Sequence, residues 1–158
     1  MRTVAIILLI SLISCVKTPH PVAKAEQKTE QVQKEETPMT DRIKITVSGT
    51  TLPIVLENND ATRALVAALR ESPITYTASD YGGFEKVGPL GRSLPTNNSQ
   101  ITTQAGDVIL YSGNQIVLFY GSNSWSYTRI GNMEYGSLEE LKAFLKAGEG
   151  DISVTLSL

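Results

Sequence analysis

The stretch GDVILYSGNQIVLFY, residues 106–120, decides the fold class. Two apolar runs, VILY at 108–111 and QIVLFY at 115–120, flank the turn SGN at 112–114. Short apolar runs on either side of such a turn predict an antiparallel hairpin. Because each run is almost continuously apolar, we expect protein to cover both faces of this hairpin.

Strand patterns continue on both sides of the hairpin. Towards the N-terminus, apolar residues alternate with polar ones over 43–47 and again over 52–56, and 74–78 resumes as a strand. Pro53 has no N–H to donate, so we expect an edge or a bulge there. Towards the C-terminus, 127–130 predicts a strand. The end of the chain, ISVTLSL, predicts a last strand whose inward residues are Ile152, Val154, Leu156 and Leu158.

Two helices are expected among these strands. Asp60 should cap a helix over 61–70, where apolar residues recur every fourth position, and Ser72-Pro73 ends it. The pattern Ser137 to Glu140 is a capping box that opens the second helix. We expect the buried stripe of this second helix to consist of Leu138, Leu141, Phe144 and Leu145.

These elements together predict a mainly β fold. Strands at both ends of the domain can pair and close the sheet, and closure removes the exposed sheet edges. One helix in the first half and one near the end are well placed to plug the open ends. We therefore predict a closed antiparallel β-barrel with two capping α-helices over residues 42–158.

The segment SDYGGFEKVGPLGRSLPTNNSQITT, residues 79–103, is predicted to be a long loop. It is rich in glycine and proline, yet it holds too many apolar residues for a disordered tract. Long loops in compact domains usually bind or cover something. We expect this loop to fold across the barrel and form one wall of a pocket lined by Tyr81, Phe84, Arg92 and Trp125, the last in the polar turn GSNSWSY.

The first residues indicate export. Met1-Arg2 is followed by an apolar run over 4–13, which is shorter than the roughly 20 residues that span a bilayer and has the proportions of a secretory signal. Its end, Leu-Ile-Ser-Cys at 12–15, resembles a bacterial lipobox. The resemblance implies that residues 1–14 are a lipoprotein signal peptide and that Cys15 carries the lipid. An ordinary signal peptide with an incidental cysteine is the alternative.

Residues 15–41 are expected to form a flexible tether, because they are rich in Lys, Glu, Gln, Thr and Pro. Several acyl chains on Cys15 would hold the membrane firmly. Val16 after the cysteine resembles the outer-membrane sorting pattern of double-membraned bacteria. We therefore expect an exported lipoprotein in the cell envelope, on the outer membrane and facing the periplasm if the bacterium has two membranes.

Composition excludes several function classes. The single histidine is His20 and the single cysteine is Cys15, both before the domain. The domain therefore has no Ser–His catalysis and no cysteine nucleophile, and it lacks the usual zinc and copper ligands. A net charge of −2 does not provide the excess of positive charge that is typical of nucleic-acid-binding proteins. We expect no cofactor, no metal and a monomer.

Three stretches, SDYGGFEKVGPLGRSLP (79–95), QITTQAGDVILYSGNQIVLFYGSNSWSYTRIG (100–131) and DISVTLSL (151–158), resemble the bacterial cyclophilin-like domain family. The resemblance covers residues 42–158 and implies a cyclophilin-like β-barrel, in a group whose members are not established proline isomerases. True cyclophilins share only the spacing of Gln115 and Trp125 with this chain. Their arginine after a Phe-His pair and their Phe-Met-x-Gln-Gly-Gly segment are absent here.

Two functions follow from this resemblance as hypotheses. The first is a binding module for a peptide or a small apolar ligand, with the candidate ligand-binding residues Tyr81, Phe84, Arg92, Gln115, Tyr120 and Trp125. The second is a divergent peptidyl-prolyl cis-trans isomerase, since lowering an amide rotation barrier of ~18–20 kcal/mol requires no nucleophile.

In the isomerase, Arg92 or Arg129 would donate to the prolyl nitrogen. Each arginine also has a simpler interpretation. Arg92 would be a solvated loop residue, and Arg129 would be paired with an acid at the barrel rim. A structural envelope protein without a pocket is a third hypothesis.

Overall fold

The computed structural model describes residues 40–158. The predictions for the signal peptide, Cys15, His20 and the tether fall on residues outside this part of the chain, so they stay predictions. No helix within residues 40–158 is both long enough and apolar enough to cross a membrane.

The described residues contain nine strands and two helices. In chain order these are β1 (Arg42–Val47), β2 (Thr50–Leu56), α1 (Asp60–Glu71), β3 (Ile74–Tyr81), β4 (Glu85–Pro89), β5 (Ser99–Thr102), β6 (Asp107–Tyr111), β7 (Gln115–Phe119), β8 (Ser124–Met133), α2 (Leu138–Phe144) and β9 (Ile152–Ser157).

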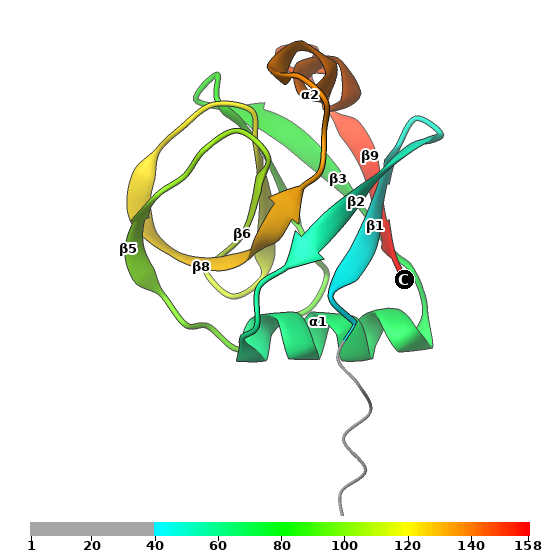
Figure 1. Ribbon diagram of the computed structural model, residues 1–158, viewed down its shortest axis with the longest axis vertical. Helices are drawn as coiled ribbons and strands as arrows, with labels where there is room; N and C mark the ends of the chain where they lie inside the picture. The colour runs from blue at the N-terminus through cyan, green and yellow to red at the C-terminus, as the bar shows by residue number, and fades with distance from the viewer. Residues whose placement is uncertain (1–39) are drawn as a thin grey trace, which may run out of the picture. The chain divides into compact units, whose positions relative to one another are not determined.

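The strands form a closed antiparallel barrel. Their order is β2-β1-β9-β3-β4-β7-β6-β8, and the pairing of β8 with β2 closes the ring. The first and last strands of the domain, β1 and β9, lie side by side, with Val47 opposite Val154. The ninth strand, β5, pairs with β8 and stands outside the ring (Figure 1). The predicted mainly β, closed antiparallel barrel is confirmed.

The two helices lie at opposite ends of the barrel (Figure 1), as predicted. Leu65 of α1 and Leu141 of α2 are both fully buried in the barrel core. The N-cap of α1 is Asn59, not Asp60, because the Asn59 side chain accepts from the Thr62 N–H in a reciprocal capping box. The predicted stripe of α2 is wrong at Leu138, which is 47% exposed.

The central hairpin is covered on both faces, as its apolar runs predict. Side chains of a strand alternate between two faces. Val108 and Leu110 of β6 point into the large core inside the barrel, whereas Ile109 belongs to a second, smaller cluster on the outer face. In this second cluster Tyr127 of β8 packs over Phe119 of β7, so β8 covers the outer face.

The prediction of one long loop over 79–103 is wrong. β3 runs to Tyr81, a tight turn follows at Gly82 and Gly83, whose φ angles are 63° and 76°, and β4 begins at Glu85. The glycines at this turn allow the left-handed backbone that a hairpin requires. Within 79–103, the longest stretch without regular structure is residues 90–98, between β4 and β5.

Two predictions about single residues are also corrected. Trp125 lies within β8 opposite Ile101 of β5, not in a turn. Leu158 is 41% exposed and does not face inward, because the last strand ends at Ser157.

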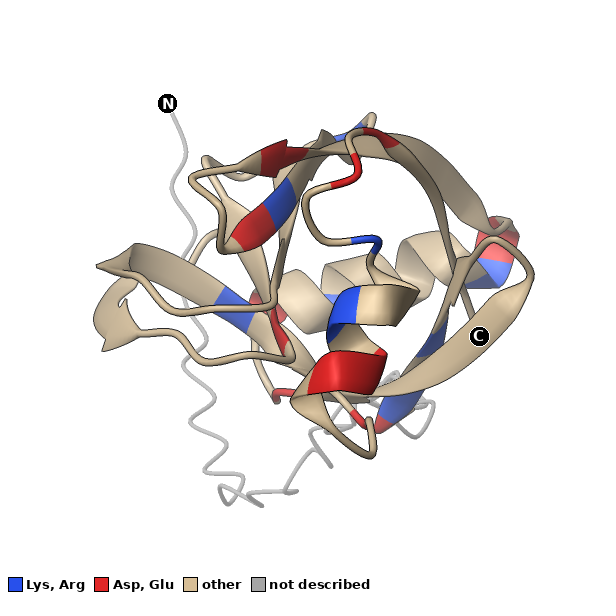
Figure 2. Cartoon of the chain, turned by 90° about the horizontal axis from the view of Figure 1, so that it is seen from above, with Lys and Arg blue, Asp and Glu red and all other residues tan. Residues whose placement is uncertain are grey.

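Acidic and basic residues are interspersed over the described barrel instead of gathering on one face (Figure 2). Large single-sign fields steer charged partners from a distance. With the two signs mixed, the local surroundings of a pocket decide which ligand it favours.

Candidate functional site

A pocket of about 370 Å³ opens on the outer face of the barrel. It lies next to the second apolar cluster, where the start of β8 stands over β4, β7 and β6. Its lining comes from strands and from the β7–β8 turn, and consists of Tyr81, Glu85, Val87, Tyr111, Gln115, Val117, Asn123, Trp125 and Tyr127.

Strand alternation explains why these residues meet. Positions 85 and 87 of β4 share its outer face, as do 115 and 117 of β7, and the ladder places Val87 opposite Val117. Tyr111 of β6 lies opposite Gln115. The floor of the pocket is therefore built from paired positions of adjacent strands, which hold these side chains at fixed spacing.

Aromatic rings form most of the wall. Tyr127 is buried and contacts Tyr111 edge to face, with 6.1 Å between ring centroids. On its other side Tyr127 packs against Phe119 at 5.9 Å. Tyr81 and Trp125 are 66% and 57% exposed and stand at the opening. Aromatic surface around a concave, largely apolar space is typical of ligand pockets.

Glu85 is the only acid or base among the lining side chains that carries a charge near neutral pH. The residue is only 5% exposed, and its Oε2 atom is buried with no hydrogen-bond partner within the described residues. Burial raises the pKa of Glu85 to about 7. Buried carboxylates are normally paired or hydrogen-bonded, so an unpartnered one in a pocket marks a position where a ligand can supply the missing contact.

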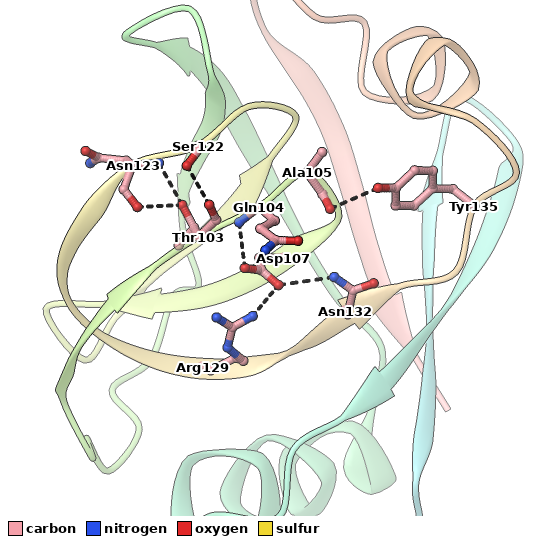
Figure 3. A network of polar contacts seen from close by, with 9 residues as sticks. All are labelled: Thr103, Gln104, Ala105, Asp107, Ser122, Asn123, Arg129, Asn132 and Tyr135. Atoms are coloured by element: carbon pink, nitrogen blue, oxygen red, sulfur yellow. Dashed lines mark hydrogen bonds and ion pairs between the residues drawn. The ribbon is translucent and has the colours of Figure 1, made fainter.

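A polar network fixes the segment that bears Asn123 (Figure 3). Thr103 and Asn123 exchange hydrogen bonds at 2.8 and 2.9 Å, and the Ser122 hydroxyl donates to the Thr103 carbonyl at 2.7 Å. The Asn123 amide then donates to the Tyr127 hydroxyl at 3.0 Å while its oxygen accepts from the Ser124 N–H. The side chain of Asn123 is thereby committed to orienting Tyr127.

The same network contains the buried carboxylate of Asp107, which is 2% exposed (Figure 3). Asp107 pairs with the Arg129 guanidinium and accepts from the Asn132 amide at 3.1 Å and from the Gln104 N–H at 2.9 Å. Nearby, the Tyr135 hydroxyl donates to the Ala105 carbonyl. Arg129 is therefore engaged by an acid, as its simpler interpretation predicts, and it does not line the pocket.

The structure divides the six candidate ligand-binding residues into two groups. Tyr81, Gln115 and Trp125 line the pocket. Phe84 stacks on Phe119 within the apolar cluster, at 6.2 Å between centroids, and Arg92 is exposed away from the lining. The remaining candidate, Tyr120, is 4% exposed and its hydroxyl donates to Asp80 at 2.9 Å.

Asp80 and Lys86 form a second polar centre on the other side of β4 from the pocket. The fully buried Lys86 ammonium contacts Asp80 Oδ2 at 2.7 Å and donates to the Gly150 carbonyl. Burial acts to raise the pKa of Asp80, but the hydrogen bonds from Lys86 and from the N–H groups of Gly148 and Gly150 outweigh it and hold that pKa at about 2. This centre ties the segment before β9 to β3 and β4.

The sequence-based candidates omitted Glu85, Tyr111, Asn123 and Tyr127. A signal for Glu85 was present, because Glu85 and Val87 lie two residues apart shortly after the Gly82-Gly83 pair. That pattern places Glu85 and Val87 on one face once 85–89 is taken as a strand. Within the described residues, no group of three or more His, Cys, Asp or Glu side chains could hold a metal ion.

Comparison with known proteins supplies the remaining finding. The model of the family described as the cyclophilin-like family matches residues 45–157. The solution structure of a hypothetical protein from Archaeoglobus fulgidus is similar in fold, with a TM-score of 0.53 and 19% sequence identity over 78% of this chain and 98% of that one. No curated protein matches the chain.

Proposed function

The chain belongs to the cyclophilin-like family, and from this premise we propose that it is a binding module which takes a peptide segment or a small, largely apolar ligand into the pocket between β4, β7 and β8. One observation carries the proposal: an aromatic-walled pocket with an unpartnered buried carboxylate, built mostly on barrel strands. Sites held by strands keep their geometry without the ligand, which reduces the entropy lost on binding.

The size of the pocket fits this function. About 370 Å³ lies at the small end of the range for ligand pockets, roughly 300–1,000 Å³. Such a space admits one side chain or a compact small molecule, not a long peptide in full. The pocket lies beside Trp125. A purely structural protein would lack such a concavity there.

The isomerase alternative has less support. It requires a donor aimed at the prolyl nitrogen inside an apolar pocket, and neither Arg92 nor Arg129 lines the pocket. Arg129 is paired with Asp107. Gln115 is a lining amide that could donate instead, so we keep isomerase activity as an outcome to be measured.

We also propose that the module is anchored in the cell envelope through lipidated Cys15, with residues 16–41 as its tether. The support is the lipobox-like sequence at 12–15 alone. Radiolabelled palmitate fed to bacteria expressing the full chain should label the protein, and Cys15→Ala should abolish the label. Equal labelling of both chains would contradict lipidation at this residue.

The binding proposal is tested with the single tryptophan of the chain, Trp125, as the reporter. We expect the neutral probe N-phenyl-1-naphthylamine and a set of Xaa-Pro peptides to change the Trp125 fluorescence of the full-length chain saturably. Tyr111→Ala should weaken binding by about tenfold, equivalent to about 1.4 kcal/mol. The control Leu138→Ala, on exposed α2, should bind as the unchanged chain does.

NMR exchange spectroscopy of the same peptides measures isomerisation directly. Uncatalysed exchange takes tens of seconds or longer, so weak catalysis would appear as exchange cross-peaks. Saturable binding without exchange would support the binding module. Exchange that disappears in Gln115→Ala would replace it with an isomerase, and the absence of binding by every probe would overturn the proposed function.

A further inference from the structure

The carboxylate of Glu85 has no counter-ion among the residues that line the pocket. Lysine and arginine are absent from the lining residues. The neighbouring cation in sequence, Lys86, lies on the opposite face of β4 and is paired with Asp80. An ionised carboxylate that is buried and unpaired is strongly unfavourable, so a cation entering the pocket would be stabilised there.

The polar neighbours of Glu85 do not supply the missing donor. Of the two lining amides, Asn123 is engaged with Tyr127 and the Ser124 N–H, and Gln115 does not donate to Glu85 Oε2 either. The Oε2 atom of Glu85 remains buried and without a hydrogen bond. The absent partner is therefore a hydrogen-bond donor as well as a positive charge.

The walls of the pocket suit such a ligand. Four aromatic side chains surround the space, namely Tyr81, Tyr111, Trp125 and Tyr127. The faces of aromatic rings attract organic cations, and they also pack against methylene groups. Val87 and Val117 add apolar surface beside Glu85. An alkyl chain that ends in a charged amine matches both the walls and the carboxylate.

We infer that the pocket binds a primary ammonium group on a short alkyl stem, with Glu85 as its counter-ion and hydrogen-bond acceptor. The inference rests on the proposed function and names the chemistry of its ligand. A lysine side chain of a peptide and a free alkylamine share this chemistry. Because burial raises the pKa of Glu85 to about 7, an arriving ammonium would also favour release of the carboxyl proton.

Matched small probes test the inference on the full-length chain. Butylammonium and 1-butanol have nearly the same size and differ in charge, and tetramethylammonium is charged but cannot donate a hydrogen bond. We expect calorimetric titration to give at least about tenfold tighter binding of butylammonium than of either other probe. Butyramide tests the opposite case, in which a protonated Glu85 donates to a carbonyl.

Three variants locate the effect. Glu85→Gln should weaken butylammonium binding by about tenfold and leave binding of the neutral N-phenyl-1-naphthylamine within about twofold, which also reports that the pocket is intact. Glu139→Gln removes the same charge from the exposed face of α2 and should change neither. Tyr111→Leu, a change at a partly exposed ring, should weaken butylammonium binding about fivefold.

The outcomes separate the inference from the proposed function. Equal binding of butylammonium and 1-butanol, stronger binding of butyramide, or unchanged butylammonium binding in Glu85→Gln would overturn the inference while the neutral probe still supports a binding pocket. If no probe binds, the proposed function and the inference both fail. Acetyl-Gly-Lys-Gly-amide, compared with its norleucine counterpart, then identifies the source: tight binding indicates a peptide ligand, and binding of butylammonium alone indicates a free amine.

Discussion

Adjacent residues of β4, Glu85 and Lys86, have opposite surroundings although both are buried. Glu85 faces the outer pocket with an unpartnered oxygen, whereas the Lys86 ammonium contacts Asp80 at 2.7 Å. The period of two along a strand separates them. One charge thus contributes to the stability of the barrel, and the other is kept available at the candidate site.

The buried pair gives the first prediction. Asp80→Asn should lower the free energy of unfolding by about 3 kcal/mol, because it leaves the Lys86 ammonium buried without a counter-ion. Lys86→Met should cost less, about 1–2 kcal/mol, since Asp80 keeps the N–H groups of Gly148 and Gly150 at 3.1 and 2.9 Å. Urea denaturation of the two variants measures both values.

The double variant Asp80→Asn, Lys86→Met is the control for this pair. Its loss of stability should be clearly smaller than the sum of the two single losses, because no buried cation remains to be neutralised. Additive losses in the double variant would mean that the two residues act independently, and the pair would then not be the origin of the effect.

At the scale of residues, three of the six ligand-binding candidates chosen from the sequence line the pocket. Tyr81 and Trp125 could be selected because they are aromatic residues in segments predicted to be a loop and a turn, and Gln115 because its spacing to Trp125 resembles that of cyclophilins. Phe84 could not be separated from them, since its burial against Phe119 depends on the pairing of β4 with β7. Glu85 was missed because a charged residue is normally expected in solvent.

Among the elements, β8 contributes both to the candidate site and to the closure of the barrel. Its first half pairs with β5 and covers the outer pocket, and its second half pairs with β6 and with β2 to close the barrel. A register shift in its pairing with β6, between Val108 and Ile109, accompanies the change. Gly131 lies in the closing part, where a Cβ atom would meet the Val55 carbonyl oxygen and would lie 3.0 Å from Ile54 Cγ2.

The closure of the barrel at Gly131 gives the second prediction. Gly131→Ala should lower the free energy of unfolding by about 2 kcal/mol or more, because the added methyl group pushes β2 away from β8. Ser126→Ala, at an exposed position of the same strand, should stay within about 0.5 kcal/mol. Urea denaturation provides these values.

Hydrogen exchange would show where the Gly131→Ala effect acts. Amides of β2 that pair with β8 should lose protection first, while the β6–β7 hairpin keeps it. Uniform loss of protection in every strand would contradict a local effect on the seam.

The elements that sequence patterns predicted best have strong local signals. The capping box at Ser137 and Glu140 is present as expected, with hydrogen bonds of 3.0 and 3.2 Å. β4 was missed because charged residues, a glycine and a proline leave it a single apolar residue, and β5 because Ile101 is its one apolar residue. Their strand geometry comes from pairing with distant neighbours, β7 and β8. Tertiary pairing overrides weak local preference in such strands.

Across the whole molecule, two carboxyl groups should shape the pH dependence of stability in opposite directions. The pKa of Asp80 is held at about 2, below its usual value, by Lys86 and the backbone N–H groups. Its contribution is therefore present above about pH 4 and is lost as the pH falls through 2. The pKa of Glu85 is raised to about 7 by burial, so its contribution is present below about pH 4.5 and is lost as the pH rises through 7.

The third prediction follows from these signs. Between about pH 5 and about pH 8, the folded chain holds a proton on Glu85 that the unfolded chain releases, so the free energy of unfolding should fall by roughly 2–3 kcal/mol. Residues 40–158 contain no histidine, which leaves Glu85 as the main titrating group of the folded domain in this range. Glu85→Gln should remove most of the fall, while Glu139→Gln should keep it. Urea denaturation at both pH values measures the difference. An equal fall in Glu85→Gln and in the unchanged chain would show that the Glu85 carboxyl does not titrate between these pH values. Glu85 could then no longer be regarded as an unpaired buried acid.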